Sequence, residues 1–85
     1  MSRDIKFDYT ELRKKYAEVF GSQEAYAKAI GMDRTSLIKR LNNEIPFRAD
    51  EIVISQSVLN LSPEDIKIYF FTPKVEKTEL MQEVV

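Results

Sequence analysis

The chain has 85 residues and a formal net charge of −1, which is the size of one domain with a modest apolar core. It contains no Cys and no His, which removes disulfides, thiol nucleophiles, zinc ligand sets and the commonest general base, so we expect no enzyme, no metal and no cofactor. No apolar run approaches the roughly 20 residues of a membrane span, and no signal-peptide pattern follows the charged start, so we expect a cytoplasmic protein without membrane contact.

We expect residues 1–7 to form a flexible N-terminus, which the first helix follows over about residues 9–20. Asp8, with Glu11 three residues later, is typical of an N-cap with its reciprocal partner, and Gly21 is expected to end the helix. The apolar positions at helical spacing, which are predicted to lie in the core, are Tyr9, Leu12, Tyr16, Val19 and Phe20.

Residues 23–42 have the spacing of two short helices joined by a glycine turn, which is a helix-turn-helix pattern. Ser22 and Asp33 are expected to cap these helices by accepting hydrogen bonds from backbone N–H groups. Gly31 can adopt the positive φ that a tight turn often needs, and Ala27 is small where the helices cross. The polar side chains that are predicted to face outward are Gln23, Lys28, Arg34, Thr35, Lys39 and Asn42.

A loop over residues 44–48 separates the third helix from a fourth over about residues 49–59. The apolar residues of this fourth helix cover more than one face, so the helix either is deeply buried or presents an apolar stripe to a partner. Ser62 and Pro63 provide an N-cap and an N1 proline for a fifth helix, which ends before Pro73. The folded domain is therefore predicted over residues 8–73 and a C-terminal tail over residues 74–85.

Four landmarks occur in order along the chain: Phe7-Asp8-Tyr9, the pattern G-x-Q-x-x-x-A-x-x-I-G from Gly21 to Gly31, Leu41-Asn42, and YFFTPKV from Tyr69 to Val75. In these landmarks the chain resembles the phage repressor and Cro-type helix-turn-helix regulators, and it is particularly similar to small regulators of Gram-positive phages and prophages. The resemblance implies an all-α, compact five-helix lambda-repressor-like DNA-binding domain, with the helix-turn-helix at helices 2 and 3.

The resemblance also implies which side chains bind DNA. The matching positions are base contacts at Arg34, Thr35 and Lys39 and phosphate contacts at Gln23 and Asn42. Two outward-facing residues that the resemblance does not match are further candidates: Ile38 as a secondary base contact and Lys28 as a phosphate contact. An arginine can donate two parallel hydrogen bonds to guanine, and each well-made contact of this kind contributes roughly 1 to 3 kcal/mol of discrimination. Ile38 either touches a thymine methyl group or packs against the domain. Arg40 occupies a place that is apolar in many relatives, although Leu41 could take over that packing.

These observations predict a sequence-specific transcriptional regulator of a phage lysis-lysogeny switch, which binds double-stranded operator DNA. Domains of this size usually bind as symmetric pairs, so we expect a homodimer. Candidates for its pairing surface are Ile54, Val58, Ile68 and Phe71, and in the tail Leu80, Met81, Val84 and Val85.

The alternative is a modulator or antirepressor that uses the same fold to bind a partner phage repressor. Residues 1–43 hold nine Lys/Arg and six Asp/Glu, a balance of +3, which favours DNA, whereas residues 44–85 hold four and eight, a balance of −4. The near-zero total and the apolar residues of the fourth and fifth helices favour a protein partner.

Overall fold

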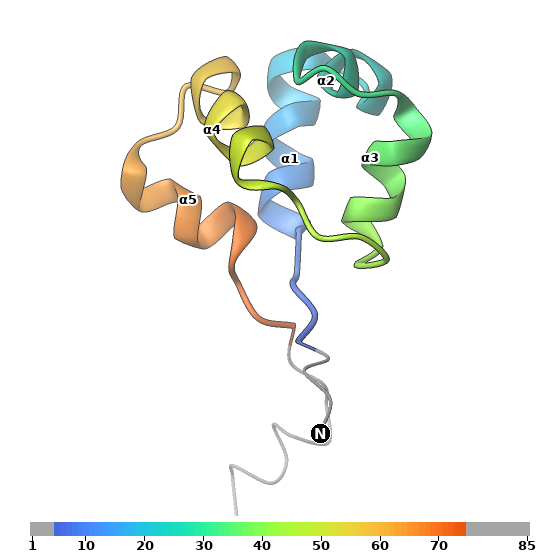
Figure 1. The fold of residues 1–85 in the computed structure, drawn as a ribbon. Coiled ribbons are helices and arrows are strands. Elements are labelled where there is room, and N and C mark those ends of the chain that lie inside the picture. The colour runs from blue at the N-terminus through green and yellow to red at the C-terminus, as the bar shows by residue number, and fades with distance from the viewer. Residues whose placement is uncertain (1–4, 75–85) are drawn as a thin grey trace, which may run out of the picture.

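Five helices follow one another along residues 5–74, the part of the chain that the structure, a computed structural model, describes (Figure 1). They are α1 (Thr10–Phe20), α2 (Gln23–Ala29), α3 (Arg34–Leu41), α4 (Ala49–Val58) and α5 (Pro63–Phe70). Within this described range no strand forms, and one isolated antiparallel bridge joins Phe7 to Pro73. The predicted all-α fold of five helices is confirmed.

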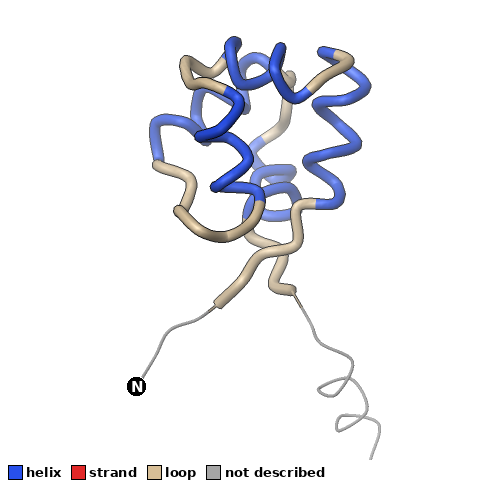
Figure 2. The backbone as a smooth tube through the Cα atoms, turned by 90° about the vertical axis from the view of Figure 1, so that its right-hand side faces the viewer, coloured by secondary structure: helices blue, strands red, loops and turns tan. Residues whose placement is uncertain are grey.

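Helix α1 packs against both α2 and α5, so it joins the two halves of the domain. Helix α2 packs on α3, and α4 packs on α5. Figure 1 shows α1 between these two pairs. The two ends of the described chain leave the domain side by side at the same end, as the view in Figure 2 also shows, and a backbone hydrogen bond of 2.8 Å joins Lys74 to Lys6.

Side-chain caps begin α2, α3 and α5 where the sequence predicts them. A side-chain oxygen of Ser22, of Asp33 and of Ser62 accepts a hydrogen bond from the backbone N–H three residues later. Gly21 ends α1 with a φ of 81°, and Gly31 forms the turn between α2 and α3 with a φ of 84°. Residues with a Cβ rarely adopt this left-handed conformation, so glycine is the residue best suited to both turns.

The start of α1 differs from the predicted capping arrangement. Tyr9 occupies the N-cap position and its side chain makes no capping bond. The Asp8 carboxylate accepts hydrogen bonds from the backbone N–H and the hydroxyl of Thr10, at 2.9 and 2.6 Å. Glu11 lies 3.5 Å from the Lys14 amine instead of reaching back to the cap. Asp8 was predicted at the N-cap position, but it lies one residue before it, and its carboxylate supports the first turn from there.

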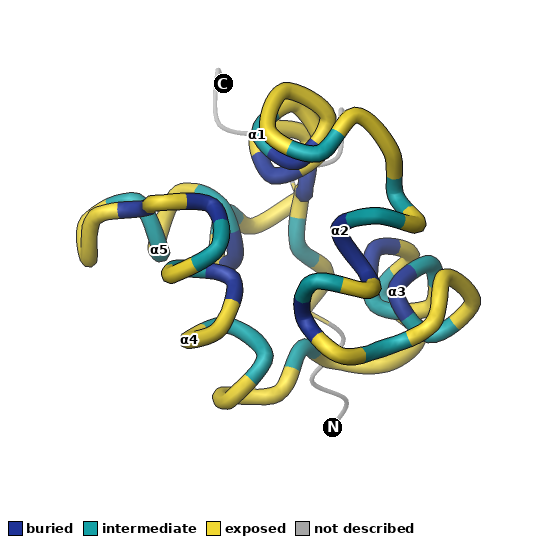
Figure 3. The backbone as a smooth tube through the Cα atoms, turned by 90° about the horizontal axis from the view of Figure 1, so that it is seen from above, coloured by how far each residue is buried: buried dark blue, intermediate teal, exposed yellow. Residues whose placement is uncertain are grey.

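The core lies where the inner faces of the helices meet, and the buried parts of the tube in Figure 3 face this interior. Tyr26, Phe70, Leu12, Leu37 and Leu59 are the largest apolar side chains that are fully buried. Burying a large apolar side chain contributes about 1.5 to 3 kcal/mol, so these few residues dominate the stability of so small a core.

Helix α4 buries an unexpected residue. Ser55 is fully buried, whereas Val53 is 64% and Ile54 is 40% exposed. Helix α4 packs mainly on α5, and its Ile52 and Val58 pack against the core while Val53 and Ile54 lie outside it. Val19 in α1 is also 45% exposed, against the prediction of a core position, because the buried face of α1 carries Leu12 and Tyr16.

Residues 1–4 and 75–85 lie outside the described range, and with them the predicted pairing candidates Leu80, Met81, Val84 and Val85. Over residues 5–74, no helix combines the length and the apolar content that crossing a bilayer requires.

Candidate functional site

Helix α3 carries the predicted base contacts on one accessible surface. The side chains of Arg34, Thr35 and Lys39 are exposed. Asp33 fixes the first turn of the helix, and hydrogen bonds from Ser36 hold the pKa of Asp33 below its ordinary value. The hydrogen-bonding groups of the three candidate residues are therefore available to a ligand, while their role in DNA binding stays a prediction.

The remaining predicted DNA contacts differ in exposure. Lys28 and Asn42 are exposed. Gln23 is half-buried, and its side-chain amide donates a hydrogen bond of 3.1 Å to the Tyr16 hydroxyl in α1. Ile38 is half-buried as well, which agrees with its alternative role in packing α3 against the domain. Gln23 was predicted to face outward, and its bond to Tyr16 instead turns its amide toward the domain.

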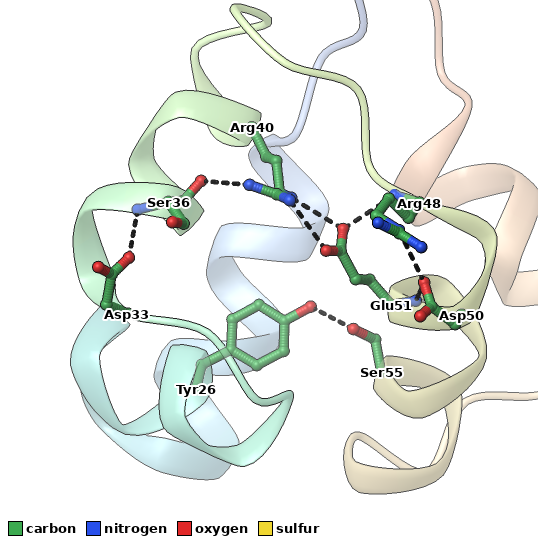
Figure 4. A network of polar contacts seen from close by, with 8 residues as sticks. All are labelled: Tyr26, Asp33, Ser36, Arg40, Arg48, Asp50, Glu51 and Ser55. Carbon is green, nitrogen blue, oxygen red and sulfur yellow. Dashed lines mark hydrogen bonds and ion pairs between the residues drawn. The ribbon is translucent and has the colours of Figure 1, made fainter.

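Arg40 connects α3 to α4 through an ion pair (Figure 4). Its Nε and Nη2 atoms donate to the two carboxylate oxygens of Glu51 at 2.8 and 2.9 Å, and Nη1 donates to the Ser36 carbonyl at 3.0 Å. Both charged side chains are only 12% exposed. Glu51 also accepts from the backbone N–H of Arg48 at 2.8 Å, so the same carboxylate fixes the loop between α3 and α4.

The sequence contained one signal for this ion pair. Arg40 occupies an inward position, and a charge that leaves water needs a partner. Glu51 is acidic and lies in the first turn of α4, a position that the helix dipole favours even without a partner, so the sequence does not single it out. Leu41 is buried, as expected if it takes over the apolar packing beside Arg40.

A second polar contact lies deeper between α2 and α4. The Tyr26 hydroxyl and the Ser55 hydroxyl are 2.7 Å apart and buried, and either can donate (Figure 4). Burial raises the pKa of Tyr26 above its ordinary value. The contact explains why a serine occupies the interior position of α4, since a buried phenol needs a hydrogen-bond partner.

An uncharged hollow of about 180 Å³ lies on a different part of the molecule from the α3 surface; we call it the apolar pocket. It is lined by Ile5, Phe7, Tyr9, Asn43, Ile45, Pro46, Phe47, Ile52, Phe70 and Phe71. Ile5, Ile45 and Phe71 are 65%, 38% and 46% exposed, so part of the lining offers apolar surface to solvent. Exposed apolar side chains that gather around a hollow mark an interaction site more often than scattered ones do.

Aromatic rings form a continuous chain along this pocket. Phe71 meets Phe7 edge to face at 5.7 Å between ring centroids, and Phe7 lies 6.4 Å from Tyr9. Tyr9 meets Phe47 at 5.4 Å, and Phe47 meets Phe70 at 5.2 Å. Such edge-to-face pairs add to the stability gained from burial alone. The pocket is therefore built from rigid rings that link the two ends of the domain.

One wall of the pocket is held by a clasp around Phe7. The Asn43 carboxamide accepts a hydrogen bond from the Phe7 N–H at 2.8 Å and donates one to the Phe7 carbonyl at 3.0 Å. On the other side, two backbone hydrogen bonds of 2.8 Å join residues 6–8 to residues 72–74. We call these contacts the terminal clasp. Asn43 has a φ of 63°, a left-handed conformation that asparagine adopts more readily than most residues with a Cβ.

The pocket was missed in the sequence because its lining comes from four separate segments. Phe71 was predicted there as a candidate for a pairing surface, whereas Tyr9 was predicted as a core residue. Among residues 5–74, no group of His, Cys, Asp or Glu side chains could hold a metal ion. The α3 surface and the apolar pocket are two candidate binding surfaces.

The sequence model of one protein family, described as "Protein of unknown function (DUF739)", matches residues 5–73. This range includes both the helix-turn-helix and almost every residue of the terminal clasp.

The fold is similar to the solution structure of the modulator of repression (MOR) of the temperate bacteriophage TP901-1 from Lactococcus lactis. The TM-score is 0.69 and the two sequences are 37% identical. The similarity covers 82% of this chain and 95% of that one, so it includes nearly the whole of the solved protein.

The chain is also 30% identical over 66 residues to the large ribosomal subunit protein bL25 of Aliivibrio fischeri strain MJ11, which covers 78% of this chain and 71% of that protein. The corresponding protein of strain ATCC 700601 / ES114 is 29% identical over 66 residues. These sequence similarities are weak beside the match to the family and to the solved structure, and we infer no function from them.

The expected membership of the Cro and repressor regulators is wrong. The match to DUF739 and the similarity to a modulator of repression overturn it. The landmarks behind that expectation include Ala27 and Gly31, which determine how helices pack and turn. Such residues specify a fold, and one fold serves proteins with different ligands.

Proposed function

The chain belongs to the DUF739 family of proteins of unknown function, and we propose that it binds a phage repressor protein and thereby modulates repression. The observation that carries the proposal is the similarity to a modulator of repression over nearly the whole of that protein. The proposed function is binding without catalysis, since the chain lacks Cys and His.

The apolar pocket supports this proposal because it has the properties of a protein-binding site. No charged residue lines it, and Phe71 and Ile45 expose apolar surface beside it. Protein interfaces gain most of their affinity from a few apolar or aromatic anchors that fill such hollows and lose water on binding. A repressor that inserts one large side chain here would remove this surface from water.

The near-zero net charge also favours a protein partner. The net charge is −1, and Arg40 of α3 already neutralises Glu51. Non-specific DNA affinity comes almost entirely from cations that neutralise phosphates, so a chain with this balance has little of it.

Direct operator binding is the second candidate function. Arg34, Thr35 and Lys39 remain exposed on α3, which is the observation that favours it. Domains of this size usually bind DNA as symmetric pairs, and Ile54, Ile68 and Phe71 are exposed enough to contribute to a pairing surface.

The test uses the purified chain, the repressor encoded by the same phage and its operator DNA. We expect the chain to bind the repressor in calorimetric titration and to release it from the operator in a mobility-shift assay. Phe71→Ala should weaken repressor binding at least about tenfold, since an anchoring contact is lost. The matched control is Val53→Ala, which removes a 64% exposed side chain outside the pocket and should leave affinity unchanged.

A further variant separates the two candidate functions. Arg34→Glu reverses a charge on α3 and should not affect repressor binding, because Arg34 lines no part of the pocket. If the chain instead retards operator DNA by itself and Arg34→Glu abolishes this while no repressor binding is detected, the chain is a DNA-binding regulator and the proposal is wrong.

A further inference from the structure

A second hollow, of about 510 Å³, lies beside the apolar pocket; we call it the polar groove. It is lined by Phe7, Asp8, Tyr9, Thr10, Arg13, Leu41, Asn42, Asn43 and Lys74. Phe7, Tyr9 and Asn43 line both hollows, so the terminal clasp forms the wall between them. A ligand that crosses this wall would contact both hollows at once.

The polar groove carries a positive balance. Its charged lining residues are Arg13, Lys74 and Asp8, so two positive charges and one negative charge give it a net charge of +1. All three are exposed, and no ion pair within residues 5–74 involves either cation. Hydrogen bonds from the hydroxyl and backbone N–H of Thr10 hold the pKa of Asp8 below its ordinary value, and the charge of Lys74 adds to this effect. Neither cation is held in an ion pair within this range, so both can contact an anionic group.

We infer that the two hollows form one docking surface for a segment of the repressor in which a large apolar side chain lies close to a carboxylate. The apolar side chain enters the apolar pocket, and the carboxylate pairs with Arg13 and Lys74 in the polar groove. This inference rests on the proposed function, because it names the chemistry of the repressor segment at the same site.

The combination of the two hollows selects a protein segment over DNA. Arg13 and Lys74 alone would suit a phosphate as well as a carboxylate. The adjoining pocket, however, has no charged lining and exposes Phe71 and Ile45 beside it. A sugar-phosphate backbone has no large apolar group to place there, whereas Leu, Phe or Met next to Asp or Glu satisfies both hollows.

The experiment measures the affinity of the full chain for the purified repressor of the same phage, at low and at high salt. Arg13→Glu together with Lys74→Glu should weaken binding about tenfold or more at low salt, and the loss should shrink at high salt because the contact is electrostatic. Phe71→Ala should weaken binding at both salt concentrations, since apolar burial is not screened. A repressor variant with its acidic residue changed to Lys should restore binding to the charge-reversed chain.

The matched control is Lys67→Glu, which makes the same charge change at an exposed residue of α5 that lines neither hollow. Circular dichroism of each variant confirms that it is folded. If the wild-type chain binds the repressor and the double reversal behaves like Lys67→Glu, the docking surface is wrong while the proposed function stands. If the wild type binds no repressor at all, the proposed function itself fails. Self-association in sedimentation that Phe71→Ala abolishes would assign the pocket to a second copy and overturn the inference.

Discussion

At the scale of single residues, the Arg40–Glu51 ion pair has the largest expected effect on stability. Its two hydrogen bonds are parallel and both side chains are 12% exposed, so removing one partner leaves a charge with little access to water. We expect Arg40→Met or Glu51→Leu alone to lower the free energy of unfolding by about 3 kcal/mol. Urea denaturation measures this change.

The double variant Arg40→Met with Glu51→Leu is the control. Two apolar side chains can replace a buried pair with little loss, so most of the stability should return. Single variants as stable as the wild type would show that the pair is solvated in solution and contributes little.

Tyr26 makes stability depend on pH in the alkaline range. Burial raises the pKa of Tyr26, so the folded chain keeps the phenol proton to a higher pH than the unfolded chain does. Above a pH of about 10, the unfolded chain loses this proton first, and unfolding becomes more favourable as the pH rises. The contribution of Tyr26 is therefore complete below about pH 10 and disappears as the pH approaches the folded pKa.

The measurement is the free energy of unfolding in urea between about pH 8 and about pH 11. Tyr26→Phe removes the titrating group and should flatten the alkaline decline relative to the wild type. An equally steep decline in both proteins would assign the effect to other groups. Tyr9, whose pKa burial also raises, is the first of these.

At the scale of helices and turns, the sequence predicted the boundaries well, because local chemistry determines them. Ser22, Asp33 and Ser62 cap their helices through neighbouring backbone groups, and Gly21 and Gly31 supply the positive φ of two turns. Each of these effects acts within a few residues of its cause, so a pattern of residue types is sufficient to find it.

The contacts that escaped prediction join residues far apart in the chain. Arg40 meets Glu51 across a loop, and Tyr26 meets Ser55 from another helix. The apolar pocket depends on Phe7 and Phe71 lying together, which requires both ends of the domain to meet. Periodicity shows which side of a helix is apolar, but it does not show which element covers that side, and Val19 was therefore misplaced in the core.

Asn43 illustrates a turn residue with a second role. Asn43 and Asn60 both have positive φ, at 63° and 57°, but only Asn43 holds Phe7 through two hydrogen bonds. Asn43→Ala and Asn60→Ala share the cost of placing alanine in the left-handed conformation. The excess loss in Asn43→Ala should be about 1 to 2 kcal/mol in thermal unfolding, since two bonds to the backbone are lost. Equal losses in the two variants would mean that the terminal clasp does not stabilise the domain.

At the scale of the whole molecule, the two candidate surfaces come from different elements. The α3 surface carries Arg34, Thr35 and Lys39. The apolar pocket is lined by residues of the N-terminal segment, the loop after α3 and the ends of α4 and α5. Because no residue of α3 lines the pocket, the two surfaces can be disabled independently by substitution. Arg40 of α3 connects the two surfaces, because its partner Glu51 also accepts a hydrogen bond from Arg48 in the loop that borders the pocket.

The meeting of the two chain ends at the terminal clasp affects how the protein can be labelled. A purification tag or fluorescent protein fused to either end of the chain is connected to the described domain at residue 5 or residue 74, and both lie beside the terminal clasp. We expect such a fusion to hinder the access of a large partner to the apolar pocket. We expect a reporter inserted at the turn around Asn60, between α4 and α5, to avoid this interference, because Asn60 is exposed and lines neither the apolar pocket nor the polar groove.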